Sequence, residues 1–147
     1  MPRPELTELL ARSLLLLGSA RAWVVHGADG IDEISTTGHT KVSECRDGSV
    51  HTFYIHPSDF GMTKANPDDL KGGDGDRNAA IIRSILEGAP GPQRHVVVLN
   101  AGAGLFVAGK VASIPEGIRM ACDAIDSGAA RGTLDRMVRS SQEVATV

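Results

Sequence analysis

Residues 24–35, VVHGADGIDEIS, place an acidic loop directly after an apolar run. The apolar residues stop at a His-Gly pair, and Asp29, Asp32 and Glu33 then fall within five positions. Carboxylates this close repel one another, so the loop needs a partner that neutralises them. In open α/β sheets, ligands bind beyond the carboxyl ends of the strands. A strand ending at the His-Gly pair would therefore put the acidic cluster where such a fold binds its ligand.

The elements around this stretch favour an α/β fold. Residues 4–17 have the spacing of an amphipathic helix, with Pro4 in the first turn and Gly18 at the end. The apolar residues of this helix are Leu6, Leu9, Leu10, Leu14 and Leu17. Residues 23–26 then read as a short buried strand, because they are nearly all apolar and a glycine-bearing loop follows.

A hairpin is predicted next. Residues 40–46 and 49–56 flank Asp47-Gly48, and Asp-Gly between two strand-like runs is the strongest short hairpin signal. Residues 57–71 contain several turn-forming residues and are expected to be irregular.

Three helices are predicted in the second half of the chain. Asp76 is expected to cap a helix over residues 77–87. Ser113 and Glu116 form a capping box that opens a helix ending at Gly128. A final helix follows, with Leu134, Met137 and Val138 expected to point inward.

Residues 95–110, HVVVLNAGAGLFVAGK, fit two structures. The three valines suggest a buried strand, but the apolar character continues for too long. A buried helix is the alternative, in which Gly102 and Gly104 would allow close contact with another helix at a propensity cost of about 1 kcal/mol each. The local pattern leaves both open.

Composition narrows the possible functions. The chain has 147 residues, 41% of them hydrophobic, which suits one domain with a packed core. A net charge of −3 without a long basic run argues against nucleic acid as a partner. Cys45 and Cys122 lack metal-site spacing and are expected to be reduced thiols. No run is long enough to span a bilayer and no export signal is evident, so we expect a cytoplasmic protein without a membrane partner.

Asp32 and Glu33 are the strongest candidates for a chemical role. Magnesium is often held by one or two carboxylates and completes its shell with water and phosphate oxygens, which an adjacent Asp-Glu pair can serve. The alternative is that they cap a turn or a helix start. Asp74 and Asp76 resemble half of a calcium loop, but the required glycine and final glutamate are missing, so helix capping accounts for them better.

The sequence gives less support for a chemical role of the other polar residues. The histidines lack zinc spacing, and no dinucleotide or P-loop motif is present. The hydroxyls of Ser35, Thr36 and Thr37 have no evident base beside them in the sequence, so the prediction includes no catalytic nucleophile.

Taken in order, several segments resemble the C-terminal part of the anthranilate phosphoribosyltransferases, from about Glu5 to Gln142. These segments are VVHGADGIDEIS, ECRDGSV, HPSDFGM, DLKGGDGDRNAAIIRSILEG, GPQRHVVVLNAGAGLFVAGK and EGIRMACDAIDSGAARGTLDRMV. The resemblance implies a transferase of tryptophan biosynthesis that joins anthranilate to phosphoribosyl pyrophosphate and releases pyrophosphate, with Mg²⁺ as cofactor. It also implies that Asp32 holds one magnesium ion and Glu33 contacts two, while Asp29 is a loop residue.

The resemblance sets expectations for fold and organisation as well. It implies the C-terminal part of a mixed, mostly parallel sheet flanked by helices, with the antiparallel hairpin at its side, and a helix over residues 95–110. Residues 1–147 are then a single partial domain of a family that is homodimeric. The family's glycine-rich GTGGD loop, its KHGNR segment, its anthranilate-gripping arginine and its N-terminal helical domain, the main dimer interface, have no counterpart in the sequence.

Three functional hypotheses follow. The first is an enzyme, or part of one, of the phosphoribosyltransferase class, in which no transferase turnover is expected from this chain alone. The second is a nucleic-acid-binding relative without transferase activity, which the net charge of −3 disfavours. The third is an inert truncated product whose apolar faces stay exposed.

Overall fold

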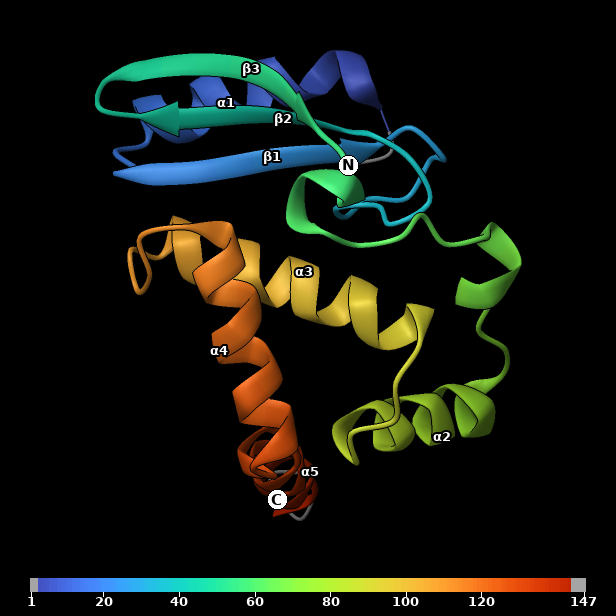
Figure 1. The fold of residues 1–147 in the computed structure, drawn as a ribbon. Coiled ribbons are helices and arrows are strands. Elements are labelled where there is room, and N and C mark those ends of the chain that lie inside the picture. Colours follow the sequence, from blue (N-terminus) through green and yellow to red (C-terminus); the bar gives the residue numbers. More distant parts are fainter. Residues whose placement is uncertain (1–2, 144–147) are drawn as a thin grey trace.

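The three strands form an antiparallel sheet at one end of the molecule (Figure 1). The computed structural model describes residues 3–143. Within them, β1 (Arg21–Gly27), β2 (Thr40–Arg46) and β3 (Ser49–Ile55) lie in the order β1-β2-β3, and both strand pairs are antiparallel. The mostly parallel sheet expected from the resemblance is therefore not what the described residues form. The connections explain the difference, because parallel neighbours need a crossover, whereas a loop and a tight turn join these strands.

The predicted hairpin is confirmed. Arg46 pairs with Ser49, so the turn between β2 and β3 consists of Asp47 and Gly48. Asp47 has φ of 50° and Gly48 has φ of 77°, and turns of this kind match the twist of the flanking strands. β1, expected to be buried, is instead only half-buried along most of its length, because it lies at an edge of the sheet.

α1 (Thr7–Leu16) covers one face of the sheet, after a 3-10 turn over Pro4–Leu6 (Figure 1). Its buried residues are Thr7 and Ala11, and the Thr7 hydroxyl accepts a hydrogen bond of 3.0 Å from Ser43 on β2. The leucine stripe predicted from spacing is therefore largely on the outside. The exposed residues of this stripe are Leu9, Leu10 and Leu17, and the neighbouring Leu16 is exposed as well. Small side chains at the contact let the helix approach the strands closely, which the leucines would prevent.

The ambiguous apolar stretch is a helix, α3 (Pro92–Val107), so the strand alternative is wrong. α3 packs tightly on α4 (Ile114–Asp126). A Cβ atom added to Gly102 would lie 2.7 Å from the Ile118 amide nitrogen, and one added to Gly117 would collide with the Gly102 backbone. Close contact at Gly102 is confirmed. The same prediction for Gly104 is wrong, because open space surrounds it.

The helix caps largely follow the prediction. α2 (Gly75–Leu86) is capped by Asp74, whose carboxylate accepts from the Arg77 amide at 2.9 Å, so Asp76 lies in the first turn and is not the cap. α4 begins as expected at Ser113, which accepts from the Glu116 amide at 3.4 Å.

The remaining segments add short helices and a final long one. Residues 57–71, expected to be irregular, include two 3-10 helices, Pro57–Phe60 and Pro67–Leu70. α5 (Ala129–Glu143) ends the described chain and has no buried residue. Leu134 is half-buried, but Met137 and Val138 are exposed, so the inward orientation expected of those two is wrong. The reason is that α5 lies at the end of the molecule opposite the sheet and packs mainly on α4 and α2 (Figure 1).

α3 contributes residues to two hydrophobic clusters within residues 3–143. One cluster contains Leu99 and Ala103 of α3, together with Ile34 from the β1–β2 loop and Ile114 of α4. The other contains Val98 of α3 and lies among α2, α3 and α4. Because Ile34 belongs to the first cluster, the loop that carries the acidic residues is anchored on α3.

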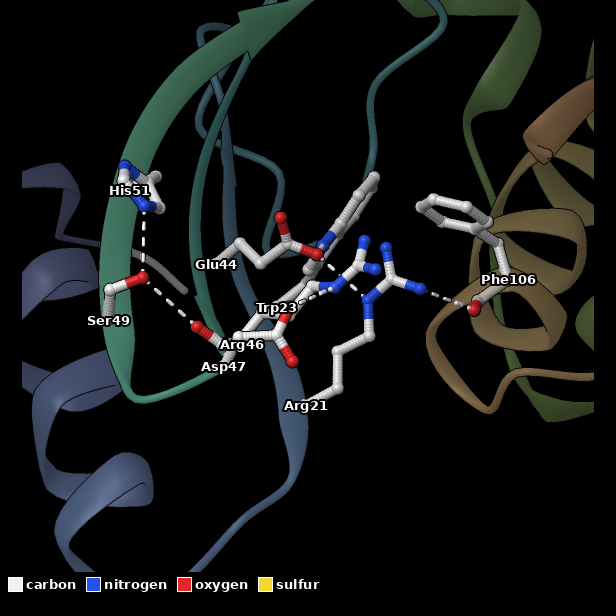
Figure 2. Close-up of polar contacts among 8 residues, drawn as sticks. All are labelled: Arg21, Trp23, Glu44, Arg46, Asp47, Ser49, His51 and Phe106. Atoms are coloured by element: carbon white, nitrogen blue, oxygen red, sulfur yellow. Dashed lines mark hydrogen bonds and ion pairs between the residues drawn. The ribbon is translucent and has the colours of Figure 1, made fainter. Parts of the chain in front are cut away.

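Arg21 ties the sheet to the end of α3 (Figure 2). Its guanidinium forms an ion pair of 2.8 Å with Glu44, donates to the Phe106 carbonyl at 2.9 Å and lies 3.9 Å above the Phe106 ring. The Trp23 indole donates to the same Glu44 oxygen at 2.8 Å. These contacts hold the sheet and α3 in one orientation relative to each other.

Two simpler expectations can also be compared with the structure. Cys45 is buried and Cys122 is partly buried, and both are free thiols. Across residues 3–143, no helix combines the length and the apolar character needed to cross a membrane.

Candidate metal site in the loop between β1 and β2

The loop after β1 begins with a tight turn. Gly27 donates to the Ile31 carbonyl at 3.0 Å, and Gly30 donates back to the Gly27 carbonyl at 2.9 Å. Gly30 has φ of 91°, a conformation that favours glycine. At Gly27, an added Cβ atom would lie 2.5 Å from the Ile31 side chain. The two glycines of the HGADG motif therefore fold the loop back on itself, directly before the acidic pair.

Asp29 holds this loop together from inside. Its carboxylate accepts hydrogen bonds from the Ser35 hydroxyl at 2.7 Å, from the Thr37 hydroxyl, and from the Ile31 amide at 3.3 Å. Burial of the carboxyl opposes its ionisation, but these hydrogen bonds outweigh burial and lower the pKa of Asp29. Asp29 was predicted to be a loop residue without a further role, and the structure shows it as the acceptor around which the loop folds.

The same contacts bear on the hydroxyl residues. The sequence showed no base beside Ser35 or Thr37, and the structure places the Asp29 carboxylate next to both. A carboxylate with a lowered pKa is a weak base, however, and both hydroxyls are buried. Their arrangement is that of a folded turn.

Asp32 and Glu33 are exposed, whereas the four residues after them are buried. Ile34 is 3% exposed and Thr36 is 0% exposed. The Thr36 carbonyl accepts from the Ala65 amide at 2.9 Å, which ties the loop to the segment after β3. The two predicted site residues thus stand on the surface of a loop whose next residues are fixed in the interior.

Glu33 lies close to two other acidic residues, Asp32 and Asp29. Its pKa is raised, first by partial burial and then by the charges of Asp32 and Asp29. A cation placed beside the acidic pair would relieve this repulsion. Glu33 also borders a cavity of about 280 Å³ whose wall is mostly apolar, formed by residues of α2, α3 and the loop, including Ile31, Asn78, Ile82 and Val97.

Asn100 of α3 holds the backbone directly after Glu33. Its side-chain oxygen accepts from the Ile34 amide at 2.9 Å, and its side-chain nitrogen donates to the Ile34 carbonyl at 2.9 Å. The same nitrogen donates to the Val96 carbonyl one turn earlier in α3, also at 2.9 Å. Sequence reasoning missed this residue. The available signal was a lone asparagine within a long apolar helix, since a polar group there needs a specific partner.

The other candidates do not join this site. Asp74 caps α2, and Asp76 lies beside it in the first turn. Among residues 3–143, no three histidine, cysteine or acidic side chains converge to hold a metal ion. The candidate site therefore consists of Asp32 and Glu33 alone, with remaining ligands to come from water and a bound phosphate.

An α/β chain with an acidic pair on the loop after its first strand has the features of a protein that binds a ligand at that edge. The comparison with protein families defines the class, since residues 1–131 match the glycosyl transferase family, a/b domain. The chain belongs to this family.

Individual relatives have more specific names than the family. A curated protein of Azorhizobium caulinodans, an anthranilate phosphoribosyltransferase, is 54% identical over 136 residues, which is 92% of this chain and 40% of the relative. The anthranilate phosphoribosyltransferase of Acetivibrio thermocellus is 52% identical over 135 residues, 92% of this chain and 39% of its own. The chain thus spans about 40% of the length of the curated relatives that it matches.

The chain also aligns with solved structures of anthranilate phosphoribosyltransferases. The crystal structure of anthranilate phosphoribosyltransferase from Thermus thermophilus aligns with a TM-score of 0.84 at 37% identity, covering 94% of this chain and 40% of that one. A variant of the Saccharomyces cerevisiae enzyme with magnesium bound aligns with a TM-score of 0.86 at 25% identity, covering 97% of this chain and 42% of that one.

Proposed function

We propose that this chain supplies the magnesium-binding edge of an anthranilate phosphoribosyltransferase. The reaction transfers the phosphoribosyl group of phosphoribosyl pyrophosphate to anthranilate and yields N-(5-phosphoribosyl)anthranilate and pyrophosphate, a step of tryptophan biosynthesis. The observation that carries the proposal is the exposed Asp32-Glu33 pair on a loop anchored in the core, in a chain about half identical to curated enzymes of this name.

The residues present fit magnesium. Both candidate ligands are carboxylates, the hard oxygen donors that this ion prefers, and a divalent cation would balance their adjacent negative charges. Two carboxylates suffice for magnesium when water and phosphate oxygens complete its shell. A solved structure of the Saccharomyces cerevisiae relative has magnesium bound, which supports magnesium as the ion.

The chemistry asks for positioning and charge balance. The bond between the anomeric carbon of ribose and a pyrophosphate oxygen breaks, and its electron pair leaves with pyrophosphate. The amine nitrogen of anthranilate bonds to that carbon, and its proton passes to solvent or to the released pyrophosphate. When bound, magnesium neutralises charge on the leaving pyrophosphate. Asp32 and Glu33 would bind this ion and keep it at a fixed position. The loop that carries them is held by Gly27, Asp29 and Ile34.

The proposal extends to the setting of the enzyme. It includes a cytoplasmic location, the homodimer implied by the resemblance, and the remaining walls of the site supplied by sequence that the relatives have outside the matched segment. The alternative of a nucleic-acid-binding relative has little electrostatic support, since the chain carries a net charge of −3.

A hybrid enzyme tests the proposal. This chain replaces the matching segment of the Azorhizobium caulinodans relative, to which it is 54% identical over 136 residues. With phosphoribosyl pyrophosphate and magnesium present, anthranilate fluorescence should decline, whereas the 147-residue chain alone should give no turnover. A folded hybrid without magnesium-dependent turnover would contradict the proposed function.

A further inference from the structure

Asn100 makes a contact that the sequence does not predict and the proposed reaction does not by itself require. Its carboxamide pairs with both sides of one backbone residue, Ile34, which lies 66 positions away in the chain. Two hydrogen bonds of 2.9 Å in opposite directions fix the position of the peptide groups and also their orientation. The residue immediately before Ile34 is Glu33.

The geometry points to Asn100 as a positioning residue for the metal ligand Glu33, an inference that rests on the proposed function. The Ile34 side chain is buried against Leu99 and Ala103 of α3, so side chain and backbone of the same residue are held by one helix. Rotation of the peptide between residues 33 and 34 would break the hydrogen bond from the Ile34 amide to Asn100. The backbone on the C-terminal side of Glu33 is thereby restrained, and with it the direction of the Glu33 side chain.

Asn100 itself has little freedom. Its nitrogen also donates to the Val96 carbonyl in the preceding turn of α3. α3 in turn cannot shift against α4, because Gly102 and Gly117 meet at the backbone. Groups that orient a metal ligand are part of a metal site, and their loss typically lowers metal affinity by roughly 10-fold to 100-fold.

A second asparagine provides a matched control. Asn78 of α2 accepts from the Gly73 amide at 2.9 Å and donates to the Gly73 carbonyl at 2.9 Å. This is the same pair of hydrogen bonds on a loop that does not carry the acidic pair. Asn78 shares a cavity wall with Glu33, but its two hydrogen bonds hold Gly73 and not the acidic loop. Asn78→Ala should therefore reproduce the cost of losing a pair of side-chain hydrogen bonds to the backbone while leaving the backbone at residue 33 in place.

The first measurement follows the loop directly, in the 147-residue chain. Hydrogen exchange of a peptide covering residues 30–37 should become faster in Asn100→Ala and stay unchanged in Asn78→Ala. Exchange in Asn100→Ala equal to that of the parent chain would overturn the inference. This result is independent of whether the chain takes part in any transferase.

The second measurement uses Mn²⁺ as the probe, in the hybrid enzyme with inorganic pyrophosphate present. Asn100→Ala should weaken Mn²⁺ binding and raise the magnesium concentration for half-maximal turnover by roughly 10-fold or more. Asn78→Ala should leave both unchanged at temperatures where it is folded. Equal affinities in all three proteins would contradict the positioning role.

Asn100→Asp keeps the inference testable if the alanine variant does not fold. Aspartate keeps the shape and the acceptor for the Ile34 amide, but it loses both donated hydrogen bonds. Its added negative charge by itself would favour a cation, so weaker Mn²⁺ binding reports lost positioning, and unchanged or tighter binding contradicts it. Absence of turnover in the unsubstituted hybrid would count against the proposed function. It would leave the positioning inference intact, because hydrogen exchange tests the hydrogen bonds between Asn100 and Ile34 without any turnover.

Discussion

Gly102 of α3 and Gly117 of α4 meet backbone to backbone, and neither position has room for a methyl group. This contact sets the distance between the two helices. It also fixes the helix that carries Asn100, and through it the loop with the acidic pair. The contact between two helices is thus part of what holds the acidic loop in place.

The first prediction concerns this contact. Gly102→Ala should lower the free energy of unfolding by about 1–3 kcal/mol, because the added methyl group forces the helices apart. Gly104→Ala, on the same helix in open space, should instead raise it by about 0.5–1 kcal/mol through helix propensity. Urea unfolding of both variants is the measurement, and equal changes would show that the helix contact does not limit packing.

The second prediction concerns the link between sheet and α3. Arg21→Ala should destabilise the chain by about 2–3 kcal/mol, because Glu44 loses its ion pair in a largely buried setting. Arg21→Lys should recover little, since an ammonium group lacks the flat fork that both pairs with Glu44 and lies over the Phe106 ring. Thermal and urea unfolding measure both variants.

An exposed ion pair serves as the control for Arg21. Arg12 pairs with Glu8 one turn earlier on α1, with side chains 62% and 47% exposed. Arg12→Ala should change stability by no more than about 0.5 kcal/mol. A loss at Arg12 as large as that at Arg21 would mean that net charge, and not the buried contact, accounts for the effect.

The third prediction follows from the lowered pKa of Asp29. In the folded chain this carboxyl ionises at a pKa below its ordinary value of 3.8, so the unfolded state binds the proton more readily. Its contribution to stability is therefore complete above the ordinary pKa and is lost as pH falls through the lower, folded value. Asp29→Asn should be less stable than the parent chain at neutral pH, and the difference should shrink on acidification.

Urea unfolding between about pH 7 and about pH 2 measures this difference, because the range must extend below the ordinary pKa of the carboxyl. Asp74→Asn, which removes the charge of a helix cap on α2, serves as a comparison at a site away from the loop. A constant gap between parent and Asp29→Asn across the whole range would show that the carboxylate is not what the loop hydroxyls require.

The fourth prediction separates metal binding from turn capping at the acidic pair. In the hybrid enzyme, Glu33→Gln should lower kcat/KM on the order of 100-fold, because metal ions contribute several kcal/mol to such transition states. Asp32→Asn should cost less, since the resemblance gives Asp32 one ion and Glu33 two. Turnover measured against magnesium concentration provides the test.

Turn capping would give another pattern. It predicts a stability loss of about 1 kcal/mol in either variant and an unchanged magnesium requirement. The two variants remove the same charge from adjacent positions, so each controls for the other in net charge and solubility.

The sequence by itself determined the features that depend on residues a few positions apart. Asp47-Gly48 gave the hairpin because its turn needs positive φ at neighbouring positions, and Ser113 gave the start of α4 because a cap bonds to an amide three residues on. The acidic pair could also be named from the sequence, since carboxylate chemistry and loop placement are local properties.

Tertiary structure decided what depends on contacts between distant segments. Spacing alone gave α1 a leucine face, but the close approach of β2 selected Thr7 and Ala11 as its buried residues. Periodicity left α3 open between helix and strand, and its fit against α4 selected Gly102 over Gly104.

The support of the acidic pair belongs to the same class. Asn100 reaches Ile34 across 66 positions, so no local pattern contains the pair. Local rules fix backbone angles and caps because those energies involve neighbours in the chain. The buried face of a helix, the pairing direction of strands and the partner of a lone polar residue depend on which surfaces meet, and only the folded chain brings those surfaces together.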